Sequence, residues 1–267
     1  MQVPSRQWLP AFTYVLSLLI PAFAFGQTMQ GRFVLVGDST VAPGNGWGPG
    51  FCALLTEEGG CLNLAKNGRS SGSYRAEGLW NRVMAALKDP ASAPARTWVL
   101  IQFGHNDQPG KPGRSTDLAT EFPTNMRRYV QEVKAAGANP VLITPLTRRS
   151  FKNGRVTDDL GAWADATRKV GQEERVPVLE LNADSLAAVQ AMGPVEANTL
   201  AMTSPPESVA ATAASGNSAP APKTPANPGS PVFDYTHLGP KGSTFFGRMV
   251  ASELAKAVPA TAIYLRP

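Results

Sequence analysis

The sequence predicts an α/β fold in which helices cover both faces of a parallel sheet. Short continuous apolar runs recur along the chain, and an amphipathic helical stretch follows each of them. Continuous apolar runs are typical of strands that are buried on both faces, as in a parallel sheet. The chain has 267 residues, of which 43% are apolar and 17% charged, so disorder throughout is excluded.

Five apolar runs, bounded by turn-forming residues, are the strand candidates. We expect strands at residues 33–36, 61–64, 98–101, 140–143 and 176–179. We expect helices at residues 48–57, 73–87, 119–136, 158–174 and 239–257. Because strand and helix alternate, the strands should be parallel and form the middle layer of a sandwich.

The first 26 residues have the features of a signal peptide. Arg6 is their only charge, residues 11–25 are mostly apolar, and Ala22-Phe23-Ala24 has the small-x-small pattern of a cleavage site. We therefore expect export to the periplasm or the outside of the cell; an uncleaved anchor is the alternative. Later apolar runs fall short of the roughly 20 residues that span a bilayer, so we expect no membrane association after cleavage.

The net charge of +5, which falls to +4 without Arg6, suits an acidic partner. The lysines and arginines are scattered and form no basic block, so we do not expect nucleic acid as a partner.

Residues 27–267 are expected to form one domain that contains a flexible insertion at residues 193–231. Of those 39 residues, 32 are Ala, Pro, Ser, Thr, Gly or Asn, and none is aromatic. A linker between two domains is the alternative, but only 36 residues follow the segment, which is short for an independent core.

Cys52 and Cys61 are the only cysteines. An even pair in an exported chain predicts a disulfide that closes a local loop, and two buried free thiols are the alternative.

Polar segments follow the predicted strands at the edge of the sheet where open α/β folds bind their ligands. They are Gly37-Asp38-Ser39-Thr40 after the first strand, Asn67-Gly68-Arg69-Ser70-Ser71 after the second and Gly104-His105-Asn106-Asp107 after the third.

Ser39 lies at a strand-to-helix turn, where a hydroxyl is held outward and can act as a nucleophile if a base lies within reach. His237 is the candidate base, and Asp234, three residues earlier, can accept the second ring N–H of this histidine. Each residue alone also fits an ordinary turn. The other histidine, His105, lies in a glycine-led turn and is expected to support that loop.

An ester hydrolase also needs donors for the oxyanion of its tetrahedral intermediate. The backbone N–H groups of Ser39 and Gly68 and the side-chain amide of Asn106 are the candidates. A plain turn glycine at position 68 and a turn-stabilising role for Asn106 are the alternatives.

These four blocks, which carry Ser39, Gly68, Asn106 and His237, resemble the motifs of the SGNH or GDSL hydrolase superfamily. Within it, the first three blocks and Gly46-Trp47-Gly48 are similar to rhamnogalacturonan acetylesterases. The resemblance implies a three-layer α/β/α sandwich with a five-stranded parallel sheet, a flavodoxin-like fold. It also implies catalysis with no metal and no other cofactor.

By this resemblance we expect a serine esterase that removes acetyl groups from a plant cell-wall polysaccharide, pectic rhamnogalacturonan, through an acetyl-serine intermediate. We expect the protein to be a monomer. Trp47 and Arg69 are candidates for contact with the sugar. The alternative substrates are another acetylated glycan such as xylan, a small ester, a lipid or a thioester. A carbohydrate-binding module with an inert triad, or a surface protein whose insertion recruits a partner, are alternatives outside catalysis.

Overall fold

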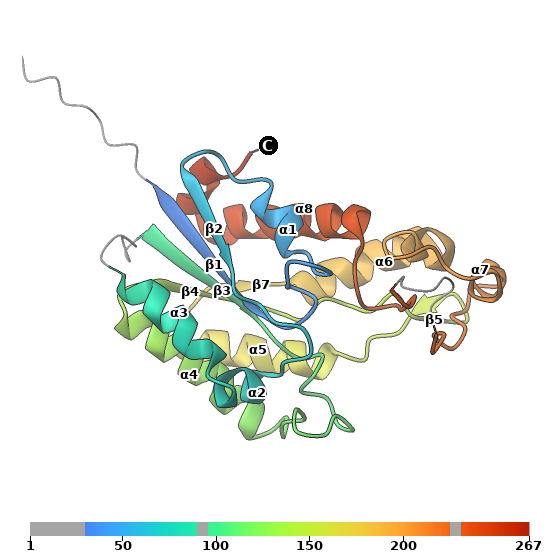
Figure 1. Ribbon diagram of the computed structural model, residues 1–267, viewed down its shortest axis with the longest axis horizontal. Helices are drawn as coiled ribbons and strands as arrows, with labels where there is room; N and C mark the ends of the chain where they lie inside the picture. The colour runs from blue at the N-terminus through green and yellow to red at the C-terminus, as the bar shows by residue number, and fades with distance from the viewer. Residues whose placement is uncertain (1–29, 90–95, 225–230, 267) are drawn as a thin grey trace, which may run out of the picture.

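A five-stranded parallel sheet with the strand order β2-β1-β3-β4-β7 forms the middle layer of the structure (Figure 1). The structure is a computed structural model, and it describes residues 30–89, 96–224 and 231–266. The predicted signal peptide, residues 1–26, lies outside the described residues. The sheet strands are β1 (Gly31–Gly37), β2 (Gly59–Asn63), β3 (Thr97–Gln102), β4 (Asn139–Ile143) and β7 (Val178–Leu179). The predicted α/β/α fold with a five-stranded parallel sheet is confirmed.

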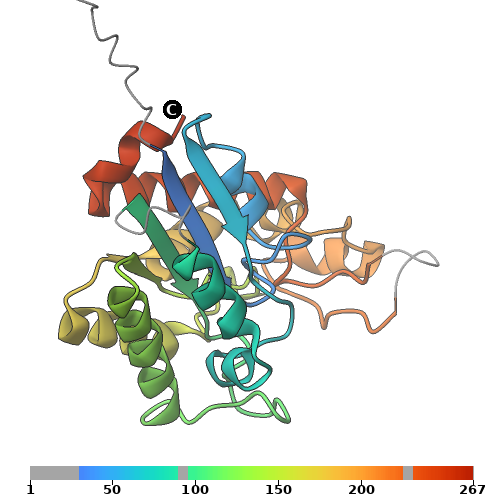
Figure 2. The ribbon, with the colours of Figure 1, turned by 60° about the vertical axis from the view of Figure 1, so that its left-hand side comes forward.

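Helices cover both faces of this sheet (Figures 1 and 2). On one face lie α1 (Gly48–Cys52), α6 (Leu181–Asn198) and α8 (Pro240–Ala257). On the other lie α2 (Ser71–Ala76), α3 (Leu79–Lys88), α4 (Glu121–Ala135) and α5 (Gly161–Glu174). The short helix α7 (Glu207–Ala214), the 3₁₀ helix η3 (Pro259–Tyr264) and the hairpin of β5 (Phe151–Lys152) and β6 (Arg155–Val156) complete the described elements.

The alternation of side chains along β1 explains why its apolar run is continuous. Phe33 and Leu35 belong to the core that packs under α1 and α8, whereas Val34 and Val36 belong to the core under α3 and α4. All four side chains are fully buried. Because successive residues of a strand point to opposite faces, a strand between two helical layers needs apolar residues at every position.

The expected helices differ from the observed ones mainly at their ends. The helix expected at residues 73–87 is two helices, α2 and α3, which are separated at Gly78. Gly78 has φ +74°, a left-handed conformation that glycine adopts easily and that does not continue a helix. The helix expected at residues 48–57 is only the five-residue α1.

The segment at residues 193–231, which its composition predicted to be a flexible insertion, contains helical structure. Helix α6 runs to Asn198, with a break at Gly193, and α7 lies wholly within the segment. Val209 and Ala213 of α7 are buried. The reason for the difference is the alanine content, because alanine has the highest helix propensity. Residues 225–230 lie outside the described residues.

The structure contains a disulfide between Cys52, the last residue of α1, and Cys61 in β2. It therefore joins the end of a helix to the edge strand of the sheet, which is the local loop closure expected from the sequence. Among the described residues, no helix has both the length and the apolar character required to cross a membrane.

We expect the double variant Cys52→Ser/Cys61→Ser to lose about 2–3 kcal/mol of unfolding free energy, because the crosslink restricts the unfolded chain. Urea unfolding of both proteins without reductant measures the difference. Equal unfolding midpoints would contradict the stabilising role.

Candidate active site

The loops that carry Ser39, Gly68 and Asn106 leave the carboxyl ends of β1, β2 and β3, whereas Asp234 and His237 lie just before α8. Ser39 follows β1 and Asn106 follows β3, and these two strands are neighbours at the centre of the sheet. The chain turns to one side of β1 to form β2 and to the other side to form β3. Such a switch in strand order is where open α/β sheets form a ligand crevice.

A buried chain of hydrogen bonds fixes the turn that carries Ser39. The Asp38 carboxylate accepts hydrogen bonds from the backbone N–H of Thr40 at 2.8 Å and from its hydroxyl at 2.7 Å. The Thr40 hydroxyl accepts from the side-chain amide of Gln102 at 2.5 Å. Gln102 in turn accepts from the indole N–H of Trp47 at 2.9 Å. All four residues of this hydrogen-bond chain are fully buried. The chain therefore fixes the backbone at Ser39 from the interior of the protein.

Trp47 is therefore not placed to contact sugar as the sequence predicted. Its ring has no exposed surface and packs against Phe51, with 6.1 Å between the ring centres. An aromatic ring can stack on a ligand only through an accessible face. The sequence could not separate the two roles, because a tryptophan in a glycine-rich loop fits either of them.

His237 and Asp234 form a close pair. The distance from Nδ1 of His237 to Oδ2 of Asp234 is 2.7 Å. The other carboxylate oxygen, Oδ1, accepts hydrogen bonds from the backbone N–H groups of Thr236 at 2.6 Å and of His237 at 2.7 Å. One third of the His237 side chain is exposed. The pairing engages Nδ1 and leaves Nε2 for chemistry, as a general base requires.

The same contacts control the charge of Asp234. Burial raises the pKa of this carboxyl, but the hydrogen bonds and the charge of His237, together with the N–H of Thr236, outweigh burial and lower the pKa to about 2. Asp234 is thus ionised throughout the range in which proteins are folded and active. An ionised partner stabilises the imidazolium that forms when His237 accepts a proton.

The buried side chain of Arg149 holds the turn from the opposite side. Its Nη2 donates to the carbonyl oxygens of Asp234 and His237, each at 3.0 Å, and its Nη1 donates to that of Thr236 at 3.3 Å. Its backbone N–H donates to the carbonyl of Tyr235 at 2.9 Å. Burial lowers the pKa of Arg149 to about 10, so the guanidinium is charged at neutral pH. One residue thereby binds all four carbonyls of the segment from Asp234 to His237.

A backbone contact joins this turn to the loop after Ser39. The N–H of Leu238, which follows His237, donates to the carbonyl of Asn45 at 2.9 Å. Ser39 is itself 6% exposed, and Asn45 is 8% exposed. The nucleophile and base predicted from sequence therefore lie on two loops that are bonded to each other.

The other two oxyanion-hole candidates also lie together. Gly68 has φ +75°, which favours glycine, and a Cβ at this position would lie 3.3 Å from Nη1 of Arg114. The side-chain amide of Asn106 donates to the carbonyl of Arg69 at 3.2 Å, which leaves its second N–H for a ligand. Nη1 of Arg114 lies 3.4 Å from the carbonyl of Gly68 and 3.5 Å from Oδ1 of Asn106. Contacts at both Nδ2 and Oδ1 therefore orient the amide of Asn106.

Arg69, the second residue predicted to contact sugar, is engaged within its own loop. It pairs with Glu77 at 2.7 Å and donates to the carbonyl of Asn67 at 2.8 Å. The structure thus places its guanidinium in the loop-stabilising role that was the alternative from sequence.

Asp107 connects the loops after β2 and β3. It accepts from the hydroxyl of Ser71 at 2.6 Å, from the N–H of Ser71 at 3.0 Å and from the hydroxyl of Thr116 at 2.9 Å. Burial raises its pKa to about 6, although these hydrogen bonds oppose the shift. Asp107 is adjacent to Asn106, so the same contacts fix the position of the amide.

His105 has a structural role beneath the loop that carries Ser39. It is 3% exposed, and its Nδ1 lies 3.6 Å from Oδ2 of the fully buried Asp38. This distance allows electrostatic attraction but is too long for a hydrogen bond. Burial raises the pKa of Asp38, yet His105 and Thr40 hold it below its ordinary value. The position agrees with the supporting role expected from sequence.

Sequence reasoning did not identify Arg149 or Arg114. The only signal for Arg149 was its place in Arg148-Arg149, just beyond the carboxyl end of β4. Arginines are mostly exposed in folded proteins, so nothing in a single sequence marks one as buried. Within the described residues, no three His, Cys, Asp or Glu side chains are grouped as metal ligands.

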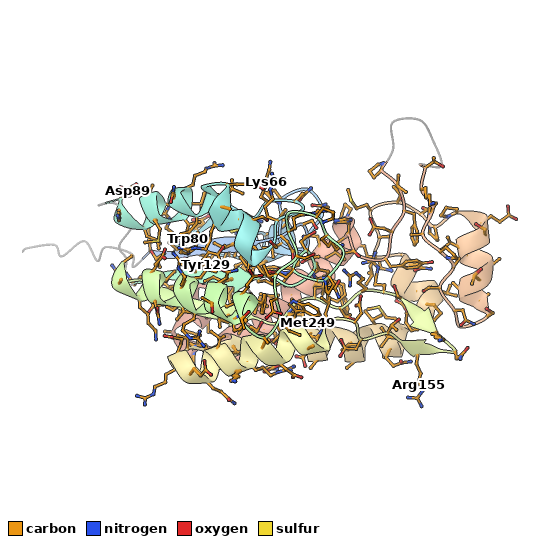
Figure 3. The ribbon with its side chains drawn as sticks, turned by 90° about the horizontal axis from the view of Figure 1, so that it is seen from below. Lys66, Trp80, Asp89, Tyr129, Arg155 and Met249 are labelled. Carbon is orange, nitrogen blue, oxygen red and sulfur yellow. A yellow bond between two sulfur atoms is a disulfide. The ribbon has the colours of Figure 1, made fainter. Side chains whose placement is uncertain are left out.

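We expect Arg149→Lys to lower kcat about 10- to 100-fold on a small acetate ester with little change in KM. Lysine carries one donor nitrogen and cannot bond three separated carbonyls, so His237 shifts while substrate binding persists. Unfolding free energy should fall by about 3 kcal/mol, as buried acceptors lose their donors. Arg155→Lys is the matched control, because Arg155 extends into solvent from the hairpin (Figure 3). Wild-type kcat in a folded Arg149→Lys protein would contradict the positioning role.

Asp234→Asn should destabilise the protein at neutral pH, and the difference from wild type should shrink as the pH falls from about 4 to about 2. A carboxyl whose pKa is lower in the folded than in the unfolded state stabilises the fold only while it is ionised. Urea unfolding at stepped pH measures both proteins. A difference that stayed constant down to pH 2 would show that the folded-state pKa of Asp234 is not depressed.

Comparison with known proteins identifies the family of the chain. The model of the GDSL-like lipase/acylhydrolase family matches residues 35–244. The chain is 33% identical to the rhamnogalacturonan acetylesterase RhgT of Bacillus subtilis over 227 residues, which are 81% of this chain and 86% of the relative. It is 27% identical to the probable rhamnogalacturonan acetylesterase YesY of the same species, over 84% of this chain and 92% of the relative.

Solved structures show the same fold. The crystal structure of the Bacillus subtilis protein YxiM has a TM-score of 0.64 and 22% identity, and the match covers 85% of this chain and 56% of that one. Axe2, an acetylxylan esterase from Geobacillus stearothermophilus, has a TM-score of 0.55 and 15% identity, with 85% of this chain and 96% of that chain covered. The resemblance predicted from the four motif blocks is confirmed, and the chain belongs to the GDSL-like lipase/acylhydrolase family of carboxylic ester hydrolases.

Proposed function

We propose that the protein removes acetyl groups from pectic rhamnogalacturonan, with Ser39 as nucleophile, His237 as base and Asp234 as the partner of the base. The observation that carries this proposal is the turn from Asp234 to His237. Its histidine is partly exposed, keeps Nε2 free and is fixed through Nδ1 by a carboxylate with a pKa of about 2. Arg149 also binds every carbonyl of this turn, which gives the histidine a more fixed position than an ordinary surface turn would.

In the first half of the reaction, Oγ of Ser39 attacks the acetyl carbonyl carbon while Nε2 of His237 takes the hydroxyl proton. The carbonyl oxygen becomes an oxyanion, which the N–H groups of Ser39 and Gly68 and the free N–H of Asn106 stabilise. The intermediate then collapses and breaks the bond to the sugar oxygen. That oxygen receives the proton from His237, and the acetyl group remains on Ser39.

In the second half, water enters the position that the sugar hydroxyl has left. His237 removes a proton from this water as it attacks the acetyl-serine, and a second oxyanion forms in the same donor set. Collapse breaks the bond to Oγ, which takes the proton back from His237, and acetate leaves. Asp234 stays ionised in both halves and stabilises each imidazolium.

The choice of a pectic polymer is supported by the relatives and by charge. RhgT and YesY, named as a rhamnogalacturonan acetylesterase and a probable one, align over more than four fifths of this chain. Rhamnogalacturonan carries a carboxylate on every uronate unit, and the chain has a net charge of +5. Acetylated xylan, whose backbone is neutral, is the substrate against which the proposal is tested.

Residues 1–26 are proposed to direct export, which would bring the enzyme to an extracellular or periplasmic polymer. N-terminal sequencing of protein secreted from an expressing cell should place the new terminus within a few residues of position 27.

Acetate release from acetylated rhamnogalacturonan and from acetylated xylan, measured side by side, tests the proposal. Wild type should favour the pectic polymer. Ser39→Ala should lower release on the order of 10³-fold or more, because the nucleophile is absent. Ser208→Ala, at an exposed position in α7, is the control and should retain activity. Near-normal turnover by Ser39→Ala would remove Ser39 from its role, and preference for xylan would overturn the proposed substrate.

A further inference from the structure

Two cations beside the oxyanion-hole candidates have no carboxylate partner among the described residues. They are Lys111 and Arg114, in the loop between β3 and α4. Arg114 uses Nη1 for the carbonyl of Gly68 and for Oδ1 of Asn106, at 3.4 and 3.5 Å. Within the part of the chain that the structure describes, its Nε and Nη2 and the ammonium of Lys111 have no hydrogen bond. Most other basic side chains near the site are paired, as Arg69 is with Glu77 and Arg148 with Asp159.

Hydrogen bonds fix the backbone of the loop that carries these two side chains. The N–H of Lys111 donates to the hydroxyl of Ser115 at 2.9 Å, and that hydroxyl donates to the carbonyl of Gln108 at 2.8 Å. The ends of the loop are closed where Thr116 donates to Asp107, through its N–H at 3.0 Å and its hydroxyl at 2.9 Å. Because the backbone is already ordered, binding of a ligand to this loop would cost little conformational entropy.

Lys111 and Arg114 are neighbours in one turn, where the N–H of Arg114 donates to the carbonyl of Lys111 at 2.9 Å. Burial lowers the pKa of Lys111, and the positive charges of Arg148 and Arg114 lower it further. Asp159 and the buried Asp38 oppose this shift only in part. Asp159 is already paired with Arg148, so Lys111 and Arg114 are left without an ion-pair partner among the described residues. An anion placed between Lys111 and Arg114 would relieve their repulsion.

Arg114 also lines a hollow of about 490 Å³ between α2, α4 and this loop. The lining is mostly hydroxyl and amide groups, among them Thr116, Thr124 and Asn125. The acid in the lining, Glu121, accepts the backbone N–H of Asp117 at 2.7 Å. A hollow that offers hydroxyl and amide groups and has a cation at its rim suits a sugar that carries an acid group.

We propose that Lys111 and Arg114 form a carboxylate subsite, which binds the uronate unit beside the acetylated sugar. This inference rests on the proposed function, because it assumes a uronate polymer in the site. Arg114 can present Nε and Nη2 to a carboxylate as two parallel donors, and Lys111 adds a point charge. The contacts of Arg114 with Gly68 and Asn106 place the bound carboxylate close to the acetyl group that reacts.

The competing role for Arg114 is positioning of Asn106 alone. In that case a substitution would impair every ester equally, whether or not the substrate carries a carboxylate. The experiment therefore compares two substrates that differ only in charge: acetylated rhamnogalacturonan oligomers, and the same oligomers after chemical reduction of their carboxyl groups to alcohols.

We expect wild type to have a kcat/KM on the order of 10- to 100-fold higher on the charged oligomer than on the reduced one. Arg114→Gln and Lys111→Gln should each reduce this ratio, and the double variant should bring it close to one. The preference of wild type should also weaken as salt is added. Arg155→Gln, which removes an exposed charge on the distant hairpin, should keep the wild-type ratio. Equal losses on both oligomers would overturn the subsite and assign Arg114 to positioning.

A second measurement separates failure of the subsite from failure of the proposed function. Deacetylated oligogalacturonate should inhibit the hydrolysis of 4-nitrophenyl acetate competitively in wild type, and the double variant should require at least tenfold more inhibitor. If wild type released no acetate from the pectic oligomers yet showed this inhibition, the subsite would stand and the proposed substrate would fall. Inhibition that was absent, or equal in both proteins, would overturn the subsite.

Discussion

The buried guanidinium of Arg149 and the backbone turn that carries the proposed base, His237, depend on each other. A charge in a protein interior is costly unless polar groups surround it, and the carbonyl oxygens of Asp234, Thr236 and His237 do so here. On the other side of the turn, the N–H groups of Thr236 and His237 point to the carboxylate of Asp234. The peptide dipoles are thus aligned between a cation and an anion. That alignment gives a loop, which has no strand ladder to hold it, the fixed geometry that proton transfer needs.

The nucleophile side of the site is rigid for a related reason. The chain of bonds from Trp47 through Gln102 and Thr40 to Asp38 has a donor and an acceptor at every step. Asp107 forms a second group of buried hydrogen bonds, which joins the loops after β2 and β3. The switch in strand order between β1 and β3 brings these loops together, and the buried polar contacts then remove their remaining freedom. Sheet topology therefore sets the place of the site, and side-chain bonds set its precision.

The parallel sheet was predictable, and the candidate catalytic residues could be proposed, because each leaves a local pattern in the sequence. Apolar runs such as residues 33–36 must fill both faces of β1, and the polar turns must follow strand ends. The roles of Trp47 and Arg149 were not predictable, because they depend on which distant groups meet the side chain. The helix α7 was missed for a different reason: its alanines were counted as part of a low-complexity segment, although they also favour a helix once Val209 and Ala213 are buried.

Arg148 extends this dependence from the base to the substrate loop. Its Nε donates to the hydroxyl of Thr236 at 3.2 Å, and its Nη2 donates to the side chain of Gln108 at 2.9 Å. Thr236 belongs to the turn of the base, and Gln108 begins the loop that carries Lys111 and Arg114. Because Asp159 neutralises its charge, Arg148 connects the two loops by hydrogen bonds and adds no unpaired positive charge. A polymer bound at the proposed subsite would therefore be held by the same network of hydrogen bonds as His237, so substrate selection and alignment of the proposed base would share one set of contacts.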